Sequence, residues 1–429
     1  MSAGHELEPD IKQPYFFLSY ARTPRLDPSD TSDPDGWVHK LYRDLCDNIL
    51  GMTSAQSGSA GFMDRNNRAG SIWTRELSQA LATCRVFVPL YSRRYFNSDN
   101  CGKEWFAFTL RKADQMARGL KPVDAIVPAL WAPVREEDLP DVARDIQYIH
   151  SDFGSRYGTE GFFGLIKLKR YQEDYEVAVW ELARRIVDVA DKTQLSPDEP
   201  TSYSLLESPF GSRTSDNPEM TGDQLRITVL ALDTGTLPKG RKVDHYGSTP
   251  EMWNPYRPAS PQPLAEYAAD LAACFGCPPA VETFDEHTTN WAANGRPIPP
   301  GLCLIDPWVT ISPAHQERLQ RLDKISQPWV CVMVLWNSQD AEMTAAEQEL
   351  RKGLALTLSH KLSSVPERWR MAATGIPTLR DFGQILPRLV MIMLKRFRND
   401  KNAPAYPAGG PHLERPRLRD AHPENSGGP

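Results

Sequence analysis

The sequence predicts an α/β protein made of two tandem doubly wound domains, each with a parallel sheet. Length is the first reason, because 429 residues exceed what one ordinary hydrophobic core accommodates. The second reason is that short apolar runs rich in β-formers alternate with amphipathic helical patterns in both halves. Such alternation is typical of parallel strands joined by right-handed crossovers. The third reason is a break at residues 192–224, which are rich in Ser, Pro, Asp and Glu.

These observations divide the chain into five segments. Residues 1–13 are polar and predict a loose N-terminus. We expect the first α/β domain at 14–191, a disordered linker at 192–224 and the second α/β domain at 225–399. Residues 400–429 are charged and rich in Pro and Gly, which predicts a disordered C-terminal tail.

Apolar runs predict the strands of the first domain. They are Tyr15–Tyr20, Phe62–Met63, Val86–Tyr91, Ala125–Leu130 and a short last strand at Gln147–His150. Three helical patterns accompany them, and Ser71 is the expected N-cap of the second. The apolar faces of these helices consist of Trp37, Leu41, Leu45 and Ile49; of Trp73, Leu77, Ala80 and Leu81; and of Val179, Leu182, Ala183, Ile186 and Val187.

The second half repeats the alternation. Its expected strands are Leu225–Leu232, Ala280–Phe284, Leu302–Ile305 and Trp329–Leu335. Four helices are expected: one from Leu264 to Phe275 that Gly276 stops, one capped by Ser312 and Pro313, and two longer ones near Glu342–Leu362 and Leu379–Phe397. We therefore expect a second sheet built like the first.

Composition excludes several classes of function. The balance of 49 basic and 55 acidic residues gives a net charge of −6, which argues against nucleic acid as a partner. No signal pattern follows Met1 and no apolar run approaches a membrane span, so we expect a soluble cytoplasmic protein. The seven scattered cysteines are typical of reduced thiols, and the lone pair Cys274 and Cys277 predicts no metal site.

One stretch, Cys84–Trp105, predicts a functional edge of the first sheet. It reads as a buried strand, a polar loop and the start of a helix that Ser98, Asp99 or Asn100 caps. Glu104 is expected in or near the first turn of this helix, beside the carboxyl edge where open α/β sheets bind ligands. The helix dipole there favours an ionised carboxylate, although acidic residues are also common in first turns without any function.

Four motifs make the first half resemble the TIR domain family. YFFLSYAR (Tyr15–Arg22) resembles its first strand, and GFMDRNNRAGSIW (Gly61–Trp73) resembles its second strand and the following loop. VFVPLYSRRYFNS (Val86–Ser98) and CGKEW (Cys101–Trp105) resemble its third strand and the helix that bears an acidic residue. The resemblance covers Tyr15–Ala190 and implies flavodoxin-like/TIR-like domains.

The resemblance implies two classes of function. Some TIR domains only assemble with other domains, and a signalling or interaction role of this kind is the expectation we favour. Others cleave the nicotinamide–ribose bond of NAD+ with a glutamate that Glu104 matches, so NAD+ is the expected substrate in the alternative. Either class implies protein partners or self-association.

Three loops should bring companions to Glu104. The companions are Tyr20, Arg22, Asp64, Arg68 and Trp73. The two arginines could bind a pyrophosphate, and Trp73 could stack on a ring. The plainer interpretations are that Trp73 lies in the core and that Arg68 is a solvated loop charge or a TIR–TIR contact. No G-x-G-x-x-G loop is present, so NAD+ would not bind in the Rossmann manner.

The whole chain also resembles the TIR-like proteins encoded beside FxSxx-COOH ribosomal peptides in bacteria, whose clusters encode a radical SAM maturase. GFFGLIKLKRYQEDY, WNPY, IDPW and PWVCVMVLWN carry this resemblance. It implies service to a ribosomal-peptide maturation or signalling system. The second domain has no counterpart of the C-x-x-E-W signature, and we expect a degenerate partner domain. Four residues are expected at its carboxyl edge: Asp306, Trp308, Trp336 and Asn337. They could bind a ligand or a partner, or cap the core.

Overall fold

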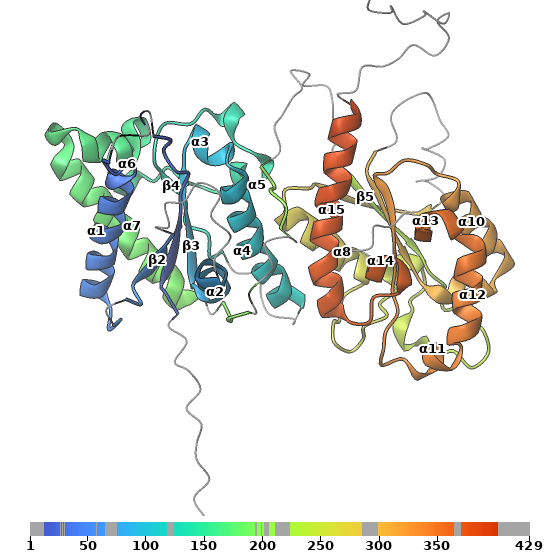
Figure 1. Ribbon diagram of the computed structural model, residues 1–429. Helices are drawn as coiled ribbons and strands as arrows, with labels where there is room; N and C mark the ends of the chain where they lie inside the picture. Colours follow the sequence, from blue (N-terminus) through green and yellow to red (C-terminus); the bar gives the residue numbers. More distant parts are fainter. Residues whose placement is uncertain are drawn as a thin grey trace, which may run out of the picture.

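The computed structural model describes most of the chain (Figure 1). The described residues are 13–64, 75–117, 124–200, 206–210, 224–284, 299–363 and 370–401, except 26, 28, 30, 57, 194 and 199. They form two α/β units, as the sequence predicts.

Each unit has a parallel four-stranded sheet, and the two sheets share one topology within the described residues. The first has the order β2-β1-β3-β4 and the second the order β6-β5-β7-β8. The strands are β1 (Phe16–Ser19), β2 (Gly61–Met63), β3 (Val86–Tyr91), β4 (Ala129–Leu130), β5 (Leu225–Leu230), β6 (Pro279–Glu282), β7 (Gly301–Ile305) and β8 (Val330–Val334). Both central pairs, β1–β3 and β5–β7, are fully buried or nearly so, which explains their continuous apolar runs.

Helices cover both faces of the first sheet (Figure 1). They are α1 (Gly36–Met52), α2 (Arg75–Thr83), α3 (Arg93–Phe96), α4 (Asp99–Ala117), α5 (Asp141–Arg144), α6 (Tyr157–Lys167) and α7 (Gln172–Lys192). Helices α1, α6 and α7 lie on one face, and α2 and α4 on the other. The expected apolar face of α1 is confirmed at Leu41, Leu45 and Ile49, but Trp37 is 42% exposed and Val38 is buried in its place.

The short last strand expected at Gln147–His150 is wrong. These residues have no strand assignment, and β4 ends the described part of the first sheet. The side chain of Tyr157 supplies the reason, because its hydroxyl accepts from the Leu130 amide at 2.6 Å and donates to the Tyr148 carbonyl at 3.2 Å. A buried phenol thus bridges the two segments where a ladder of main-chain bonds was expected.

The second sheet is also covered on both faces. Its helices are α8 (Leu264–Cys274), α10 (Pro313–Asp323), α11 (Ala341–Ala345), α12 (Glu347–Thr357), α13 (Ser359–Ser363), α14 (Arg370–Thr374) and α15 (Leu379–Lys401). The single long helix expected near Glu342–Leu362 is therefore three short ones, whereas α15 matches its prediction. Gly276, at a φ of 69°, ends α8 in the left-handed conformation that a helix-stopping glycine adopts.

Helix α4 belongs to two cores. Its Trp105 and Phe108 are buried in the core of the first sheet, whereas Phe106 and Leu110 are buried in the core of the second. Figure 1 shows α4 beside α8 and α15, and the Arg380 guanidinium lies 3.6 Å from a carboxylate oxygen of α4. The two domains therefore share a packed interface.

Parts of the expected disordered linker pack against α4. The buried guanidinium of Arg111 donates to the carbonyls of Leu195 and Ser196 at 3.2 and 3.1 Å. Gly102 leaves no room for a side chain, because a Cβ there would lie 1.8 Å from the Ser208 hydroxyl. Phe210 stacks edge-on against Trp105 with 5.7 Å between ring centroids. These contacts differ from the expectation, and the domain limits at 191 and 225 stay predictions.

Candidate active site

The carboxyl edge of the first sheet gathers four of the predicted site residues. Tyr20 and Arg22 follow β1, Asp64 follows β2, and Glu104 is on α4. The Arg22 guanidinium is 2.6 Å from the Asp64 carboxylate, and the Tyr20 hydroxyl donates to the Asp64 carbonyl at 3.2 Å. Because β1, β2 and β3 run parallel, the residues that follow them meet at one edge.

Glu104 lies in the second turn of α4, near the first turn but not within it. The helix begins at Asp99, and the Ser98 hydroxyl accepts from the Cys101 amide at 3.3 Å as the N-cap. Asp99 is the acidic residue of the first turn. The helix dipole, which acts mainly within the first turn, therefore contributes little to the Glu104 carboxylate.

One buried hydroxyl that the sequence reasoning missed, that of Ser19, contacts the Glu104 carboxyl group, and the buried Tyr95 hydroxyl contacts Ser19 in turn. The Ser19 hydroxyl donates to Glu104 Oε2 at 2.5 Å and lies 3.0 Å from the Tyr95 hydroxyl. Ser19 is 1% exposed at the end of β1, and Tyr95 is fully buried. A serine that ends a central strand next to the motif tyrosine was the available signal for this contact.

Burial, not the helix dipole, controls the charge of Glu104. Glu104 is only partly exposed, and the dense packing around its carboxyl group raises the pKa to about 8. The Ser19 hydrogen bond and the Arg22 charge lower the pKa, and the Asp64 charge raises it. Since Asp64 pairs with Arg22, that guanidinium offsets little of the burial effect. The sequence predicted an ionised carboxylate, but burial keeps the carboxyl group protonated at neutral pH.

The remaining two predicted companions, Arg68 and Trp73, fall within residues 65–74 and lie outside the described residues. Their roles stay predictions. Among the described companions, burial raises the pKa of Tyr20, so its phenol stays neutral and acts as a hydrogen-bond donor. The edge thus combines a neutral phenol, an ion pair and a carboxyl group whose proton is easily lost near pH 8.

Such an edge can respond to a positively charged ligand. A cation beside Glu104 would lower the carboxyl pKa and favour the carboxylate, which can then stabilise developing positive charge. Arg22 and Asp64 lie near enough to Glu104 to affect its charge and can bind a polar ligand from the loop side. Within the described residues, no cluster of ligands fits a metal ion.

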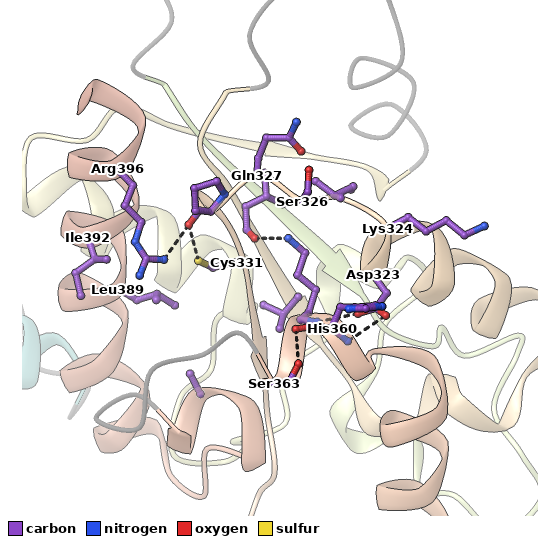
Figure 2. Close-up of a pocket in the computed structure, with 16 residues that line it drawn as sticks. Asp323, Lys324, Ser326, Gln327, Cys331, His360, Ser363, Leu389, Ile392 and Arg396 are labelled. Carbon is purple, nitrogen blue, oxygen red and sulfur yellow. Dashed lines mark hydrogen bonds between the residues drawn. The ribbon is translucent and has the colours of Figure 1, made fainter. Parts of the chain in front are cut away.

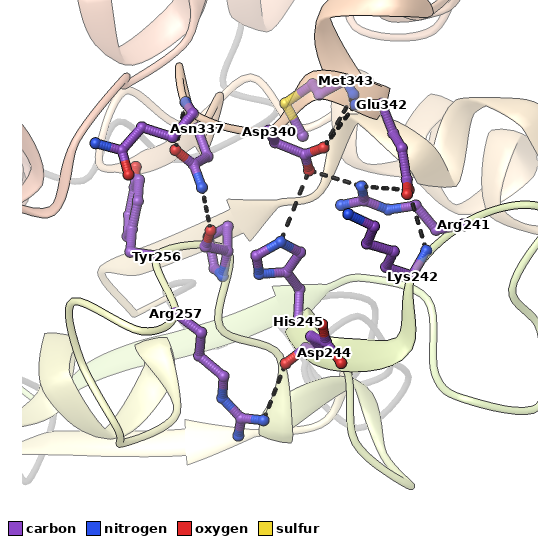
Figure 3. A network of polar contacts seen from close by, with 12 residues as sticks. Arg241, Lys242, Asp244, His245, Tyr256, Arg257, Asn337, Asp340, Glu342 and Met343 are labelled. Atoms are coloured by element: carbon purple, nitrogen blue, oxygen red, sulfur yellow. Dashed lines mark hydrogen bonds and ion pairs between the residues drawn. The ribbon is translucent and has the colours of Figure 1, made fainter.

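The equivalent edge of the second sheet is a closed polar network (Figure 3). The Arg241 guanidinium lies 2.6 Å from the Asp340 carboxylate and 3.0 Å from the Glu342 carboxylate. It also donates to the Tyr246 hydroxyl, which in turn donates to Asp306 at 3.0 Å. The side chains of Arg241 and Asp340 are 1% and 5% exposed, so the network is internal to the fold.

The residues expected at this second edge are bonded to or packed against other residues of the domain. Asp306 caps the following turn by accepting from the Trp308 amide at 3.1 Å, and the Asn337 amide donates to the Pro255 carbonyl at 2.7 Å. Trp308 lies against the Arg241 guanidinium, and Trp336 is buried. Of the roles that the sequence left open, these contacts favour capping the core over binding a ligand.

Residues 16–162 match the family model of the TIR domain. No match to the chain was found among curated proteins. The first of the two α/β units is therefore similar to TIR domains over these residues. No helix in the described part of the chain has the length and apolarity needed to cross a membrane.

Proposed function

We propose that the TIR domain cleaves the nicotinamide–ribose bond of NAD+ at Glu104. The observation that carries this proposal is the enclosed Glu104 carboxyl group, with a pKa of about 8, beside the Arg22–Asp64 ion pair. Strongly perturbed titratable groups gather at functional sites because their environment is built for one charge state of a ligand. The sequence alone favours an interaction role, whereas this geometry favours the enzyme.

The chemistry needs few groups. The bond between the ribose C1′ and the pyridinium nitrogen breaks, its electron pair leaves with neutral nicotinamide, and the ribose becomes positively charged. The Glu104 carboxylate stabilises that charge. Water then adds to C1′ and releases a proton, so the products are ADP-ribose, nicotinamide and one proton. Arg22 is the candidate for the substrate's phosphates.

Because the pKa of Glu104 is raised, we expect its carboxyl group to ionise when the substrate binds. The nicotinamide ring of NAD+ is positively charged, and its arrival beside Glu104 favours loss of the carboxyl proton. We expect NAD+ binding to release a proton at pH 7, where the free carboxyl group is mostly protonated. Reduced NADH lacks the ring charge and should bind without proton release.

The deciding experiment measures nicotinamide release from NAD+ by the full chain and by Glu104→Gln. Glutamine keeps the volume but cannot ionise, so we expect about a hundredfold or greater loss of turnover. Glu173→Gln, an exposed position on α7, is the matched control and should keep full activity. Absence of nicotinamide release by the wild-type chain at high protein concentration would overturn the proposal.

Interaction is the second candidate, and one observation favours it. Val177 and Trp180 are each 50% exposed on α7, a helix that lies on the side of the first sheet away from the second domain (Figure 1). Exposed large apolar side chains of this kind mark contact surfaces. Trp180→Glu should lower the mass of any oligomer measured by light scattering, and an unchanged mass would exclude this face.

The narrower context of ribosomal-peptide clusters rests on motifs alone. The motifs WNPY and IDPW contribute residues that hold the second fold together, such as Asn254, which donates to the carbonyls of Ser260 and Gln262. We keep service to a peptide maturation or signalling system as a proposal. Binding of the full chain to a precursor peptide, measured by calorimetry, is the test.

A further inference from the structure

Strand β8 is the outer strand of the second sheet and turns main-chain groups toward a pocket. The Trp329 carbonyl accepts from Gly301, and the Leu335 amide donates to Ile305, so the odd-numbered residues of this segment bond to β7. The amides and carbonyls of Val330, Val332 and Val334 must then point away from β7. They form the outer edge of the sheet.

The two ends of that edge are already bonded. The Lys361 ammonium donates to the Val330 carbonyl at 2.7 Å, and the Ile376 amide donates to the Val334 carbonyl at 2.9 Å. Between them, the Val332 amide and carbonyl have no hydrogen-bonding partner among the described residues. A donor and an acceptor from one residue, facing the same way, match the main chain of an extended peptide.

A pocket of about 920 Å³ lies against this edge (Figure 2). Helix α15 forms one side with Leu389 and Ile392, and α13 and the end of α10 form the other. Val332 itself lines the pocket and is buried. Residues 364–369, which connect α13 to α14 in the sequence, lie outside the described part of the chain.

The charges around the pocket are mostly positive. Lys324, Lys361 and Arg396 are among its lining residues. Asp323, its acidic member, accepts from the amides of His360 and Lys361 at 3.2 and 2.8 Å and so caps α13. An occupant that carries carboxylates would complement this charge, with acidic groups toward Lys324 and apolar groups toward α15.

The first sheet closes the corresponding edge. There the Tyr157 hydroxyl bonds to the Leu130 amide, and the Phe163 amide donates to the Trp131 carbonyl at 2.9 Å. Among the residues that the structure describes, the second sheet has the bridge between Leu335 and Ile376 at one end of this edge and the Lys361 ammonium at the other, with Val332 between them. The same topology thus leaves room for one more strand in the second domain.

We propose that the β8 edge binds an extended, acidic segment of a partner protein as a fifth strand. The segment's main chain bonds to the amide and carbonyl of Val332. Because side chains alternate along a strand, its apolar residues meet Leu389 and Ile392 while its acidic residues face Lys324. The second domain then recruits a partner, and this role is independent of chemistry at Glu104.

An array of synthetic heptapeptides tests the proposal. Peptides that alternate apolar and acidic residues should bind the full chain, and counterparts with lysine in place of the acids should not. N-methylation of a central amide should weaken the best peptide about tenfold, because it removes a main-chain bond. Binding that ignores both changes, or no binding by any peptide, would overturn the proposal.

Two variants locate the binding site. Val332→Pro removes the outward amide at a place where an edge strand tolerates proline, and it should weaken the best peptide about tenfold. Lys324→Glu should weaken it about fivefold, whereas Lys352→Glu on α12 makes the same charge change away from the pocket and should leave affinity unchanged. Equal affinity of all three variants would refute the site.

Hydrogen exchange of the free protein separates a partner from the chain itself. The Val332 amide should exchange readily when no peptide is present and become protected when the best peptide is added. Slow exchange in the free chain would show that its own residues cover the edge, and the proposal would fail. These results do not depend on NAD+ turnover.

Discussion

The carboxyl edges of the two sheets have one topology but differ in how their carboxyl groups are partnered. At the first edge, Ser19 offers Glu104 a hydrogen bond, but the guanidinium nearby is paired with Asp64. At the second edge, Arg241 meets two carboxylates and a phenol within about hydrogen-bonding distance. At the first edge the Glu104 carboxyl group has the Ser19 hydroxyl as its hydrogen-bond partner, whereas at the second edge each carboxylate contacts a guanidinium or a hydrogen-bond donor, although burial still raises the pKa of Asp306 to about 6.

This difference separates a site from a structural cluster. A buried charge that the fold satisfies contributes to one folded structure and has little left to offer a ligand. A group that burial holds away from its usual pKa stores free energy that a complementary ligand can release. The two edges contain similar kinds of polar residues, and the way in which those residues pair distinguishes one edge from the other.

The largest effect should come from breaking the closed edge. Arg241→Met leaves Asp340 and Asp306 buried without their cation and should lower the free energy of unfolding by about 3–5 kcal/mol. Urea denaturation followed by circular dichroism measures the loss. Arg184→Met removes an exposed ion pair with Glu181 and is the matched control, whose unfolding curve should not move.

The opposite result is expected at the first edge. Glu104 holds its proton up to about pH 8 when folded but only to about 4.5, the ordinary glutamate value, when unfolded. Wild-type stability therefore falls as pH rises between these values. The difference between these two pKa values corresponds to roughly 5 kcal/mol, and solvent around the partly exposed side chain reduces it. Glu104→Gln removes that loss and should be more stable than wild type by roughly 3 kcal/mol at pH 9, with a gap that shrinks toward pH 5. A gap independent of pH would disprove the raised pKa.

Ser19→Ala should sharpen the contrast by removing a donor to the Glu104 carboxylate. The ionised form loses a hydrogen bond, so the pKa of Glu104 should rise by about one further unit. Unfolding measured across the pH range reports the shift. In a Glu104→Gln background the same substitution should have no pH-dependent effect, and a persisting effect would mean that Ser19 acts elsewhere.

The smallest effect concerns the ion pair of the first edge. Arg22 and Asp64 side chains are 32% and 23% exposed, so solvent screens their attraction. A double-mutant cycle with Arg22→Gln and Asp64→Asn should give a coupling of about 0.2–1 kcal/mol. A coupling comparable to that of Arg241 with Asp340 would remove the difference between the edges.

The sequence predicted the layers of the fold better than the charges of the site. Strand runs such as Val86–Tyr91 and helix faces such as Leu41, Leu45 and Ile49 are local patterns, and the structure confirms them. The strand at Gln147–His150 failed because a distant side chain, Tyr157, takes the place of its pairing. Local apolar pattern carries no information about such a replacement.

The sequence predicted that several residues of the candidate site lie together, but it misjudged their electrostatics. The topology of parallel strands places the residues after β1 and β2 and the start of α4 at one edge, so Tyr20, Asp64 and Glu104 could be grouped from the sequence. The pKa of Glu104 depends on packing density and on Ser19, which lies 85 positions away in the chain. That information exists only once the chain has folded.

The shared helix α4 has a consequence for dissecting this protein into parts. A chain cut at residue 191 would retain Glu104 but expose Phe106 and Leu110 to water and lose the ring of Phe210 behind Trp105. The isolated fragment would therefore expose an apolar surface that favours aggregation and would hold α4 less firmly, so measurements on it would not represent the intact protein. Because α4 packs in both cores, a displacement of the second domain would also move the helix that carries Glu104.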